Sequence, residues 1–194
     1  HNKVSDVQRR QMTTVSEENI FNIAVEGTFD DCQKIVKTLF LDKEIKKRVS
    51  LTAINSINWS RIIAQAVYYF WSFKQLDINK INFIVPSGNF GNIFSARVAM
   101  NMGLPVENLY LVTNQNDILH RIISKGDMKI NNVQETYSPS MDIQISSNFE
   151  RELFENFNRN SEELKKIMNI FIDKGSFEFD NTTLSKLQKI YISE

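Results

Sequence analysis

Short apolar runs alternate with longer amphipathic segments along much of the chain, and this alternation constrains the fold more than any other feature. Strand-like runs occur at 22–27 (NIAVEG), at 49–54 (VSLTAI), in INFIVPSG from residue 81, and at 108–113 (NLYLVT). Helical spacing of apolar residues occurs at 28–40, 59–73, about 93–102 and 117–126. Because strands separated by helices imply parallel pairing with right-handed crossovers, we expect an α/β fold with a parallel sheet flanked by helices.

The pattern changes near the carboxyl end. After Val133 the chain enters a polar loop, ETYSPSMDIQISS, and helices are expected at 148–158, 161–173 and 182–192. We therefore expect two parts: an α/β core at 1–135, and a loop with a mostly helical region at 136–194. The strand at 22–27 would lead into a helix capped by Thr28 or Asp30.

Composition excludes several classes of protein. With 194 residues, 42% of them hydrophobic, the chain can bury a sizeable core. Its 23 basic and 23 acidic residues balance, so no overall field favours nucleic acid or an anionic membrane. Cys32 is the single cysteine and the histidines are His1 and His120, so neither a disulfide framework nor a metal centre is expected.

The chain shows no signal for a membrane. No apolar run approaches the roughly 20 residues needed to span a bilayer. The amino end, HNKVSDVQRRQ, has no apolar region of the kind found in a signal peptide. We therefore expect a cytoplasmic protein.

The stretch IVPSGNFGN (84–92) joins an expected strand to an expected helix. Gly88 and Gly91 can take positive φ angles and allow backbone amides to approach a ligand. The helix from about Ile93 would present unpaired amides and a partial positive charge, while Asn89 and Asn92 would add neutral donors. A phosphate would satisfy these groups, although an ordinary strand-to-helix turn explains the glycines equally well.

The chain resembles threonine synthase, a pyridoxal-phosphate enzyme of fold type II. The resemblance rests on VPSGNFGN, MGLP and VTNQNDILHRIISKGDM, and on four further motifs in the family's usual order. These are HNKVSDVQRRQMTT, NIFNIAVEGTFDDCQKIVKTLF, LTAINSINWSRIIAQAVYYF and SPSMDIQISSNFERELFE. Together they cover essentially the whole chain.

The resemblance implies roles for particular residues. It assigns the phosphate of pyridoxal phosphate to the loop that contains Gly88, Asn89, Phe90, Gly91 and Asn92. For Phe90, a core side chain that anchors the turn is at least as good an interpretation as contact with the cofactor.

Two other segments are candidates for substrate binding. Asn55, Ser56 and Asn58 lie where a strand should end and a helix begin, and either bind a substrate phosphate or carboxylate or cap the helix. The resemblance also marks the loop of Ser138 and Ser140, which either lines the site or holds a turn. His120 is expected to be structural.

The implied reaction converts O-phosphohomoserine and water into threonine and phosphate. It requires a Schiff-base lysine, which the family carries in an amino-terminal motif resembling Phe-Lys-Asp. No such motif occurs in this sequence, so we expect an amino-terminally truncated chain that lacks this lysine, is inactive alone and exposes apolar surface for self-association. The alternative function is a noncatalytic fragment that binds phosphate or another protein.

Overall fold

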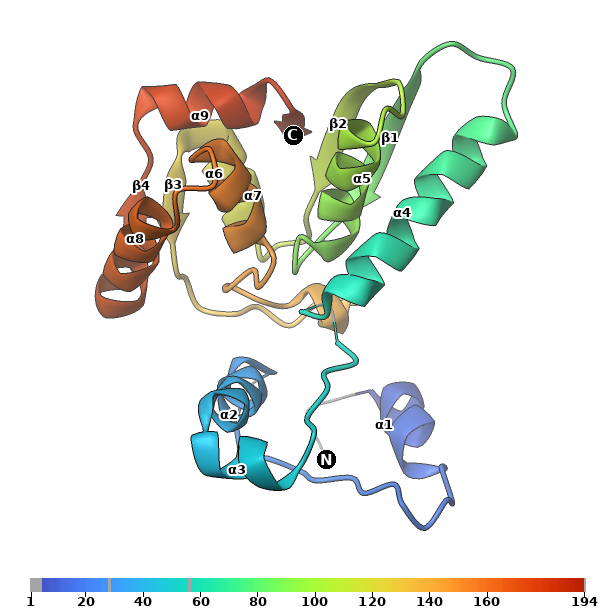
Figure 1. Ribbon diagram of the computed structural model, residues 1–194, viewed down its shortest axis with the longest axis vertical. Coiled ribbons are helices and arrows are strands. Elements are labelled where there is room, and N and C mark those ends of the chain that lie inside the picture. The colour runs from blue at the N-terminus through green and yellow to red at the C-terminus, as the bar shows by residue number, and fades with distance from the viewer. Residues whose placement is uncertain (1–4, 28, 56, 194) are drawn as a thin grey trace. The chain divides into compact units, whose positions relative to one another are not determined.

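The computed structural model describes residues 5–27, 29–55 and 57–193, without the side chains of residues 8, 29 and 30 (Figure 1). The chain forms two compact units, His1–Leu51 and Thr52–Glu194.

The first unit consists of short helices with little interior. Helix α1 spans Asp6–Thr13, α2 spans Phe29–Leu41 and α3 spans Lys43–Arg48. Asp42 caps α3, because its Oδ1 atom accepts hydrogen bonds from the amides of Glu44 and Ile45 at 2.8 and 3.0 Å. Helix α2 confirms the helix that was expected at 28–40.

The two strands expected at 22–27 and 49–54 do not form, and these predictions are wrong. Their apolar residues find no sheet to join: Ile23 and Ile54 are 86% and 83% exposed. A strand is stabilised by its neighbours across the sheet, so an alternating pattern without a partner stays irregular. The capping candidate Thr28 and the side chain of Asp30 lie outside the described residues.

The second unit contains a parallel sheet in the order β1-β2-β5. Strand β1 spans Ile81–Pro86, β2 spans Val106–Val112 and β5 spans Tyr191–Ser193. Both pairings are parallel, with Phe83 opposite Leu109 and Leu109 opposite Tyr191. The predicted α/β class and the parallel pairing of the two longer strands are confirmed.

Helices flank this sheet (Figure 1). Helix α5, Gly91–Asn101, contacts β1 and β2, and α4, Trp59–Lys74, contacts α5. Helices α6, Ile118–Lys125, and α9, Asn181–Gln188, both contact β5. Helices α7 and α8 span Phe149–Asn156 and Ser161–Lys174. Among the described residues, no helix combines the length and apolar character needed to cross a membrane.

The carboxyl-terminal helix expected at 182–192 is too long at its end. Helix α9 ends at Gln188, and Tyr191 instead enters the sheet, where it is 1% exposed. A short antiparallel pair, β3 (Asp127–Lys129) with β4 (Ser176–Glu178), was also not expected from the pattern. Runs of three residues are too short for periodicity to identify, so contacts distant in sequence decide their structure.

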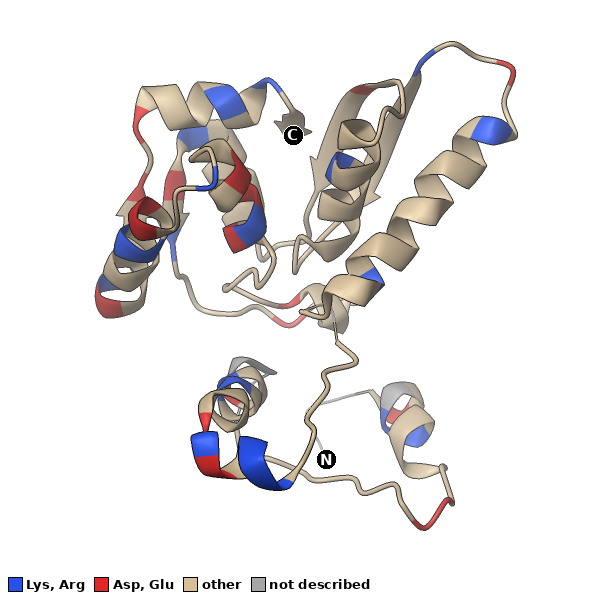
Figure 2. Ribbon diagram, viewed as in Figure 1, with Lys and Arg blue, Asp and Glu red and all other residues tan. Residues whose placement is uncertain are grey.

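The core of the second unit lies between the sheet and the helices of both sides. Leu109 in the central strand, Ile93 in α5 and Leu153 in α7 are fully buried. This core fixes the carboxyl ends of β1 and β2, from which the candidate site is built. Figure 2 shows that charged residues are sparse on β1, α4 and α5 and more frequent on α7 and α8.

Candidate functional site

The loop between β1 and α5 contains a strained residue that is not a glycine. Phe90 has φ 61°, in the left-handed region, and immediately precedes α5. Gly91 is the first residue of that helix, and neither it nor Gly88 has a positive φ. The expectation that these two glycines supply the left-handed conformation is therefore wrong.

The side chain of Phe90 compensates for this strain. It is fully buried, and its ring packs edge to face against Phe149 at 5.2 Å and Tyr191 at 5.3 Å between ring centroids. A left-handed conformation costs a non-glycine residue about 1–3 kcal/mol and persists only when the surroundings enforce it. Of the two interpretations that the sequence left open, the structure shows the core anchor.

Gly88 is required by a close approach of two chain segments. A Cβ atom at this position would lie 3.0 Å from the Cα atom of Met141 and 3.3 Å from Ile143 Cδ1. Because a backbone atom cannot yield as a flexible side chain can, any larger residue would push the 138–143 segment away from the loop. The glycine thus joins two of the segments that the sequence marked as candidates.

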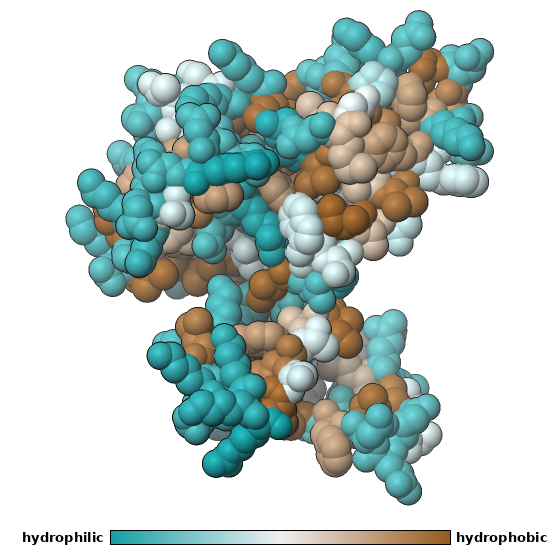
Figure 3. All heavy atoms as spheres, in the orientation of Figure 1, coloured by the Kyte–Doolittle hydropathy of each residue, from teal (hydrophilic) through white to brown (hydrophobic). Residues whose placement is uncertain are grey.

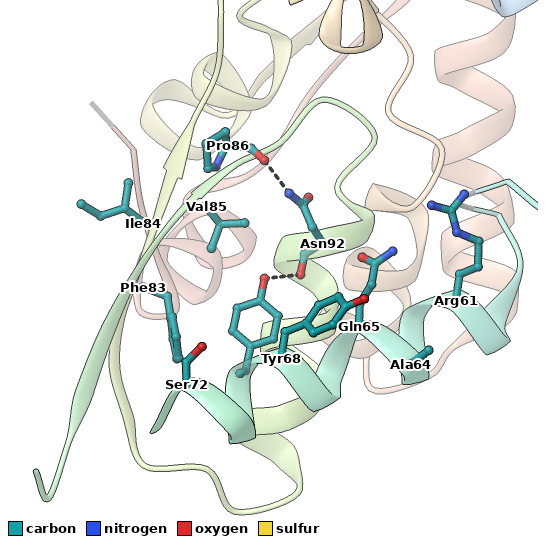
Figure 4. A pocket seen from close by; sticks show the side chains of 11 residues that line it. Arg61, Ala64, Gln65, Tyr68, Ser72, Phe83, Ile84, Val85, Pro86 and Asn92 are labelled. Carbon is teal, nitrogen blue, oxygen red and sulfur yellow. Dashed lines mark hydrogen bonds between the residues drawn. The ribbon is translucent and has the colours of Figure 1, made fainter. Parts of the chain in front are cut away.

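Asn92 braces the loop from within. Its Oδ1 atom accepts hydrogen bonds from the hydroxyl of the buried Ser87 and from the amide of Ile93, while its Nδ2 group donates to the carbonyl of Pro86 (Figure 4). Its own carbonyl accepts a hydrogen bond of 2.7 Å from Tyr69, and burial raises the pKa of that phenol, which keeps it protonated. The side chain of Asn92 therefore holds the loop closed.

The carbonyl and Oδ1 atoms of Asn89 accept hydrogen bonds, and its Nδ2 group remains available as a donor. Its carbonyl accepts two hydrogen bonds of 3.1 Å, from the backbone and side-chain amides of Asn148, and its Oδ1 atom accepts one of 3.0 Å from the Ser147 hydroxyl. Within the described parts of the chain, its Nδ2 group has no hydrogen-bond partner. Asn89 thus offers a donor whose position is already fixed.

The segment around residues 55–58 forms the start of α4. Asn58 caps this helix: its Oδ1 atom accepts from Ser60 N at 2.8 Å and its Nδ2 group donates to the carbonyl of Ala53. Asn55 Oδ1 accepts from the amide of Ile57 at 3.0 Å. Ser56 lies outside the described residues. The capping interpretation holds for Asn58, and its use for ligand binding stays a prediction.

Arg151 on α7 connects that segment to the glycine loop. Its Nη2 group donates to the carbonyl of Ile57 at 2.8 Å, and its Nε group donates to Asn148 Oδ1 at 3.1 Å. The guanidinium also lies 5.4 Å from the centre of the Trp59 ring. Since Asn148 in turn binds Asn89, one side chain links both candidate segments.

The loop at 138–142 is held by a dense polar network. Both oxygens of Asp142 accept hydrogen bonds, from the amide of Thr136 at 2.8 Å and from Asn114 Nδ2 at 2.7 Å among others. The Ser138 hydroxyl accepts from the same Asn114 amide at 3.0 Å. Ser140 is exposed on a short 3₁₀ turn, η1 (Pro139–Met141). The structure thus brings Ser138 into a scaffold and leaves Ser140 facing solvent.

His120 contacts β5, and the lysines of the amphipathic helices are at the surface. His120 Nδ1 lies 3.0 Å from the Ser193 hydroxyl, where α6 packs against β5. The lysines of the amphipathic helices, which the sequence placed toward water, are exposed; they are Lys34, Lys37, Lys46, Lys47, Lys165 and Lys166. Among the described residues, no group of His, Cys, Asp and Glu side chains is suited to hold a metal ion.

A hollow of about 610 Å³ lies beside the loop, between α4 and β1. Arg61, Gln65 and Tyr68 line it from α4, Phe83 and Pro86 from β1, and Asn92 closes one end (Figure 4). It is a wide depression at the edge of the sheet, and the glycine loop forms only its rim.

Sequence reasoning missed the residues that support the loop from α7 and β5. Asn148, Arg151, Glu152 and Tyr191 were not singled out, although the first three belong to the motif SPSMDIQISSNFERELFE. A polar residue at helical spacing gives no sign of being buried. Only the packing of α7 against α5 reveals it.

Comparison with known proteins gives a consistent result. No family model matches the chain. The threonine synthase of Pseudomonas aeruginosa is 47% identical over 195 residues, covering 100% of this chain and 42% of that protein. The threonine synthase of Saccharomyces cerevisiae is 44% identical and covers 99% of this chain and 40% of its own length.

Solved structures agree with the sequence comparison. The PLP-bound threonine synthase of Brucella melitensis superposes with a TM-score of 0.86 and 42% identity, over 100% of this chain and 42% of that one. Yeast threonine synthase gives a TM-score of 0.82 and 41% identity, over 98% and 40%. The chain thus spans about two fifths of the length of the relatives it matches. Over that span, by sequence and by fold, it belongs to the threonine synthase family.

Proposed function

We propose that the protein containing this chain is a pyridoxal-phosphate-dependent threonine synthase, which converts O-phosphohomoserine and water into threonine and phosphate. The observation that carries the proposal is identity of 47% and 44% to two threonine synthases over essentially the whole chain. The solved structure of highest likeness among those compared above is a PLP-bound member of the family. The relatives do not favour the alternative of a noncatalytic binding fragment.

The loop of residues 87–92 suits the phosphate of the cofactor. It carries no acidic side chain, it precedes an 11-residue helix, and its Asn89 Nδ2 donor is held in place by Ser147. The amides of Gly91 and Asn92, in the first turn of α5, have no acceptor within that helix, and such amides bind phosphate well. We propose that Gly88, Asn89, Phe90, Gly91 and Asn92 form the cradle, with Phe90 acting as its anchor.

The remaining candidates would face the substrate. When bound, pyridoxal phosphate supplies an electron sink that stabilises negative charge at the carbons of the substrate. Asn55, Ser56, Asn58, Ser138 and Ser140 are the proposed contacts to the phosphate and carboxylate of O-phosphohomoserine. The cofactor's covalent lysine is expected in sequence that this chain does not include.

A chimera tests the proposal. This chain would replace the matching segment of Pseudomonas aeruginosa threonine synthase, and formation of threonine and phosphate from O-phosphohomoserine would be measured. We expect an active, cofactor-loaded chimera, and expect Gly91→Val to weaken retention of pyridoxal phosphate by about a hundredfold, because the new side chain displaces the phosphate. A folded chimera that binds the cofactor without forming threonine would contradict the proposed reaction.

The control is Met102→Val at the end of α5, where the side chain is 65% exposed. It introduces valine at the carboxyl-terminal cap of the same helix and should leave cofactor binding unchanged. Unchanged binding in Gly91→Val as well would remove the role of the loop as a phosphate cradle.

We also propose that the exposed apolar face of α4 and β1 drives self-association of the isolated chain in the cytoplasm. Val67, Tyr68 and Trp71 on α4 are 60%, 69% and 62% exposed, and Ile84 on the edge strand β1 is 72% exposed. Figure 3 shows apolar side chains at the surface where Figure 1 has α4 and α5. Light scattering over a concentration series should show dimers or larger species that Trp71→Glu reduces; a chain that stays monomeric at high concentration would contradict this.

The division of the chain at residue 135 into a cofactor-binding core and a substrate-loop region stays a prediction. It would be supported if variants in residues 136–194 altered the KM for O-phosphohomoserine without altering affinity for pyridoxal phosphate.

A further inference from the structure

A buried carboxyl group lies behind the loop and takes no part in the proposed reaction. Glu152 on α7 is fully buried. Its Oε2 atom accepts a hydrogen bond of 2.6 Å from the Tyr191 hydroxyl, and its Oε1 atom accepts one of 2.8 Å from Asn156 Nδ2. Burying a carboxyl group costs free energy unless hydrogen bonds or an opposite charge offset it, so its neighbours indicate what it does.

The neighbours lead directly to the strained residue of the loop. The Tyr191 ring, whose hydroxyl is held by Glu152, packs against Phe90 at 5.3 Å. Phe149, one turn before Glu152 on α7, also packs against Phe90, at 5.2 Å between ring centroids. Both rings that pack against Phe90 therefore depend on α7: Phe149 belongs to this helix, and Glu152 of this helix holds Tyr191.

We infer that Glu152 and Tyr191 are positioning residues for the loop: their hydrogen bond fixes the ring that keeps Phe90 left-handed, and so orients the amides of Asn89 and Gly91. The inference rests on the proposed function only in assuming that the amide of Gly91 and the side chain of Asn89 meet a phosphate. Protonation of Glu152 changes what the carboxyl can accept, so the loop responds to pH through Tyr191.

The charges around Glu152 allow this response. Burial raises the pKa of Glu152 to about 7, against the opposing effects of the Tyr191 hydrogen bond and of Arg97. Arg97 Nε on α5 lies 3.9 Å from Glu152 Oε1, which is within range for charge attraction but too long for a hydrogen bond. This Nε atom is buried without a hydrogen-bond partner, so charge attraction to Glu152 is the polar interaction that partly offsets its burial.

The other groups near the carboxyl are few. Glu155 on α7 raises the pKa of Glu152 by repulsion. Lys186 on α9 donates to the carbonyl of Asn156, the last residue of α7, at 3.1 Å. Burial and the Glu152 charge raise the pKa of Tyr191, so its hydroxyl remains a donor throughout the neutral range.

Nuclear magnetic resonance on the 194-residue chain tests the inference. The amide signals of Asn89 and Gly91 would be followed from pH 5.5 to 8.5, and we expect them to shift with a midpoint near the Glu152 pKa of about 7. Glu152→Gln should abolish the shift while keeping a hydrogen-bonding side chain of the same size. Tyr191→Phe removes a bond that lowers the Glu152 pKa, so the midpoint should move to higher pH.

Two controls separate positioning from a merely structural role. Glu150→Gln removes an exposed carboxyl from the same helix, and His120→Asn removes the imidazole beside β5. Both should leave the midpoint unchanged. Loop signals that titrate identically in the chain as it is and in Glu152→Gln, with both folded, would overturn the inference.

A binding measurement keeps the two proposals apart. With inorganic phosphate as the probe, Tyr191→Phe should weaken binding by about three- to tenfold, because the ring that packs against Phe90 loses the hydrogen bond that holds it. If the unmodified chain binds no phosphate but its loop still titrates with Glu152, the cradle proposal fails and the positioning role stands. If phosphate binds equally well to both forms, the positioning role fails and the cradle stands.

Discussion

Residues 1–51 and 52–194 are similar to the same family, yet they differ in how much interior they have. In the first unit, Gln33 is the buried residue among those described, and Phe21 and Ile23 are 81% and 86% exposed. The second unit buries a continuous apolar cluster with Leu109, Leu153 and Ile93 at its centre. The difference shows that two segments can both resemble the same family and still differ in how much apolar surface each one buries.

The physical reason lies in what each segment can pack against. Helices of 6 to 13 residues have little stability of their own. In the second unit, helices of similar length are stable because the sheet or neighbouring helices cover their apolar faces. Helical spacing therefore predicts where a helix forms but not whether it is buried.

Hydrogen exchange should show the largest contrast. Amides of β2 and α5 open only with the whole core, while those of α2 and α3 open locally. We expect exchange at least about a thousandfold slower in the former, measured by mass spectrometry on the intact chain. Comparable protection in both units would break the comparison.

A matched pair of leucine substitutions should give the next largest effect. Leu109→Ala in β2 removes a fully buried side chain and should lower the free energy of unfolding by about 2–5 kcal/mol. Leu41→Ala at the end of α2, where leucine is 77% exposed, should change it by less than about 0.5 kcal/mol. Denaturant unfolding measures both, and equal effects would mean that α2 has a covered face.

The pH dependence of stability should belong to the second unit. Because burial raises the pKa of Glu152 from an ordinary value of 4.5 to about 7, the folded chain holds this proton over a range where the unfolded chain has lost it. Stability from this group is therefore full below pH 4.5 and is lost as pH rises to about 7, by roughly 3 kcal/mol in all.

Glu152→Gln should remove that part of the pH dependence, as unfolding midpoints measured at pH 5 and pH 8 would reveal. Glu44→Gln on the exposed helix α3 is the counterpart in the first unit and should leave the profile unchanged. If Glu152→Gln keeps the full change in stability between pH 5 and pH 8, another group causes that change.

Removing a helix cap should have the smallest effect on the free energy of unfolding, and the same change can be made in each of the two units. Asn160 caps α8 by accepting from the amides of Glu162 and Glu163, both at 3.2 Å, and Asp42 caps α3 in the same manner. Asn160→Ala should lower the free energy of unfolding by about 1 kcal/mol. Asp42→Ala should reduce helical circular dichroism without shifting the main unfolding transition; a shift would place α3 in the cooperative unit.

The sequence predicted the central fold well and its margins less well. Helices at 59–73 and 161–173 and the strands at 81 and 108 were found because their apolar periodicity is long and regular. The strands at 22–27 and 49–54 were wrong because a run of six residues shows alternation without showing whether a partner strand exists. Strand β5 was missed because three residues carry no period.

The candidate site was predicted in part. The position of the loop follows from a strand, a glycine pair and a helix, and the structure agrees with that order. Its geometry does not follow: Phe90 takes the conformation expected of glycine because Tyr191 and Phe149, distant in sequence, hold its ring. Sequence reasoning that starts from local propensity has no access to such support.

The place of β5 in the sheet has a consequence for the order of events during synthesis. Leu111 and Ser193 are 82 positions apart and are joined by a hydrogen bond, so this edge of the sheet closes long after β2 has left the ribosome. Contacts that close such long loops form late and slowly. The loop at 87–92 is translated early, but the tyrosine that fixes its anchor arrives about a hundred residues later. The conformation of Phe90 can therefore be fixed only after Tyr191 has been made, so the loop at 87–92 is completed among the last parts of this unit.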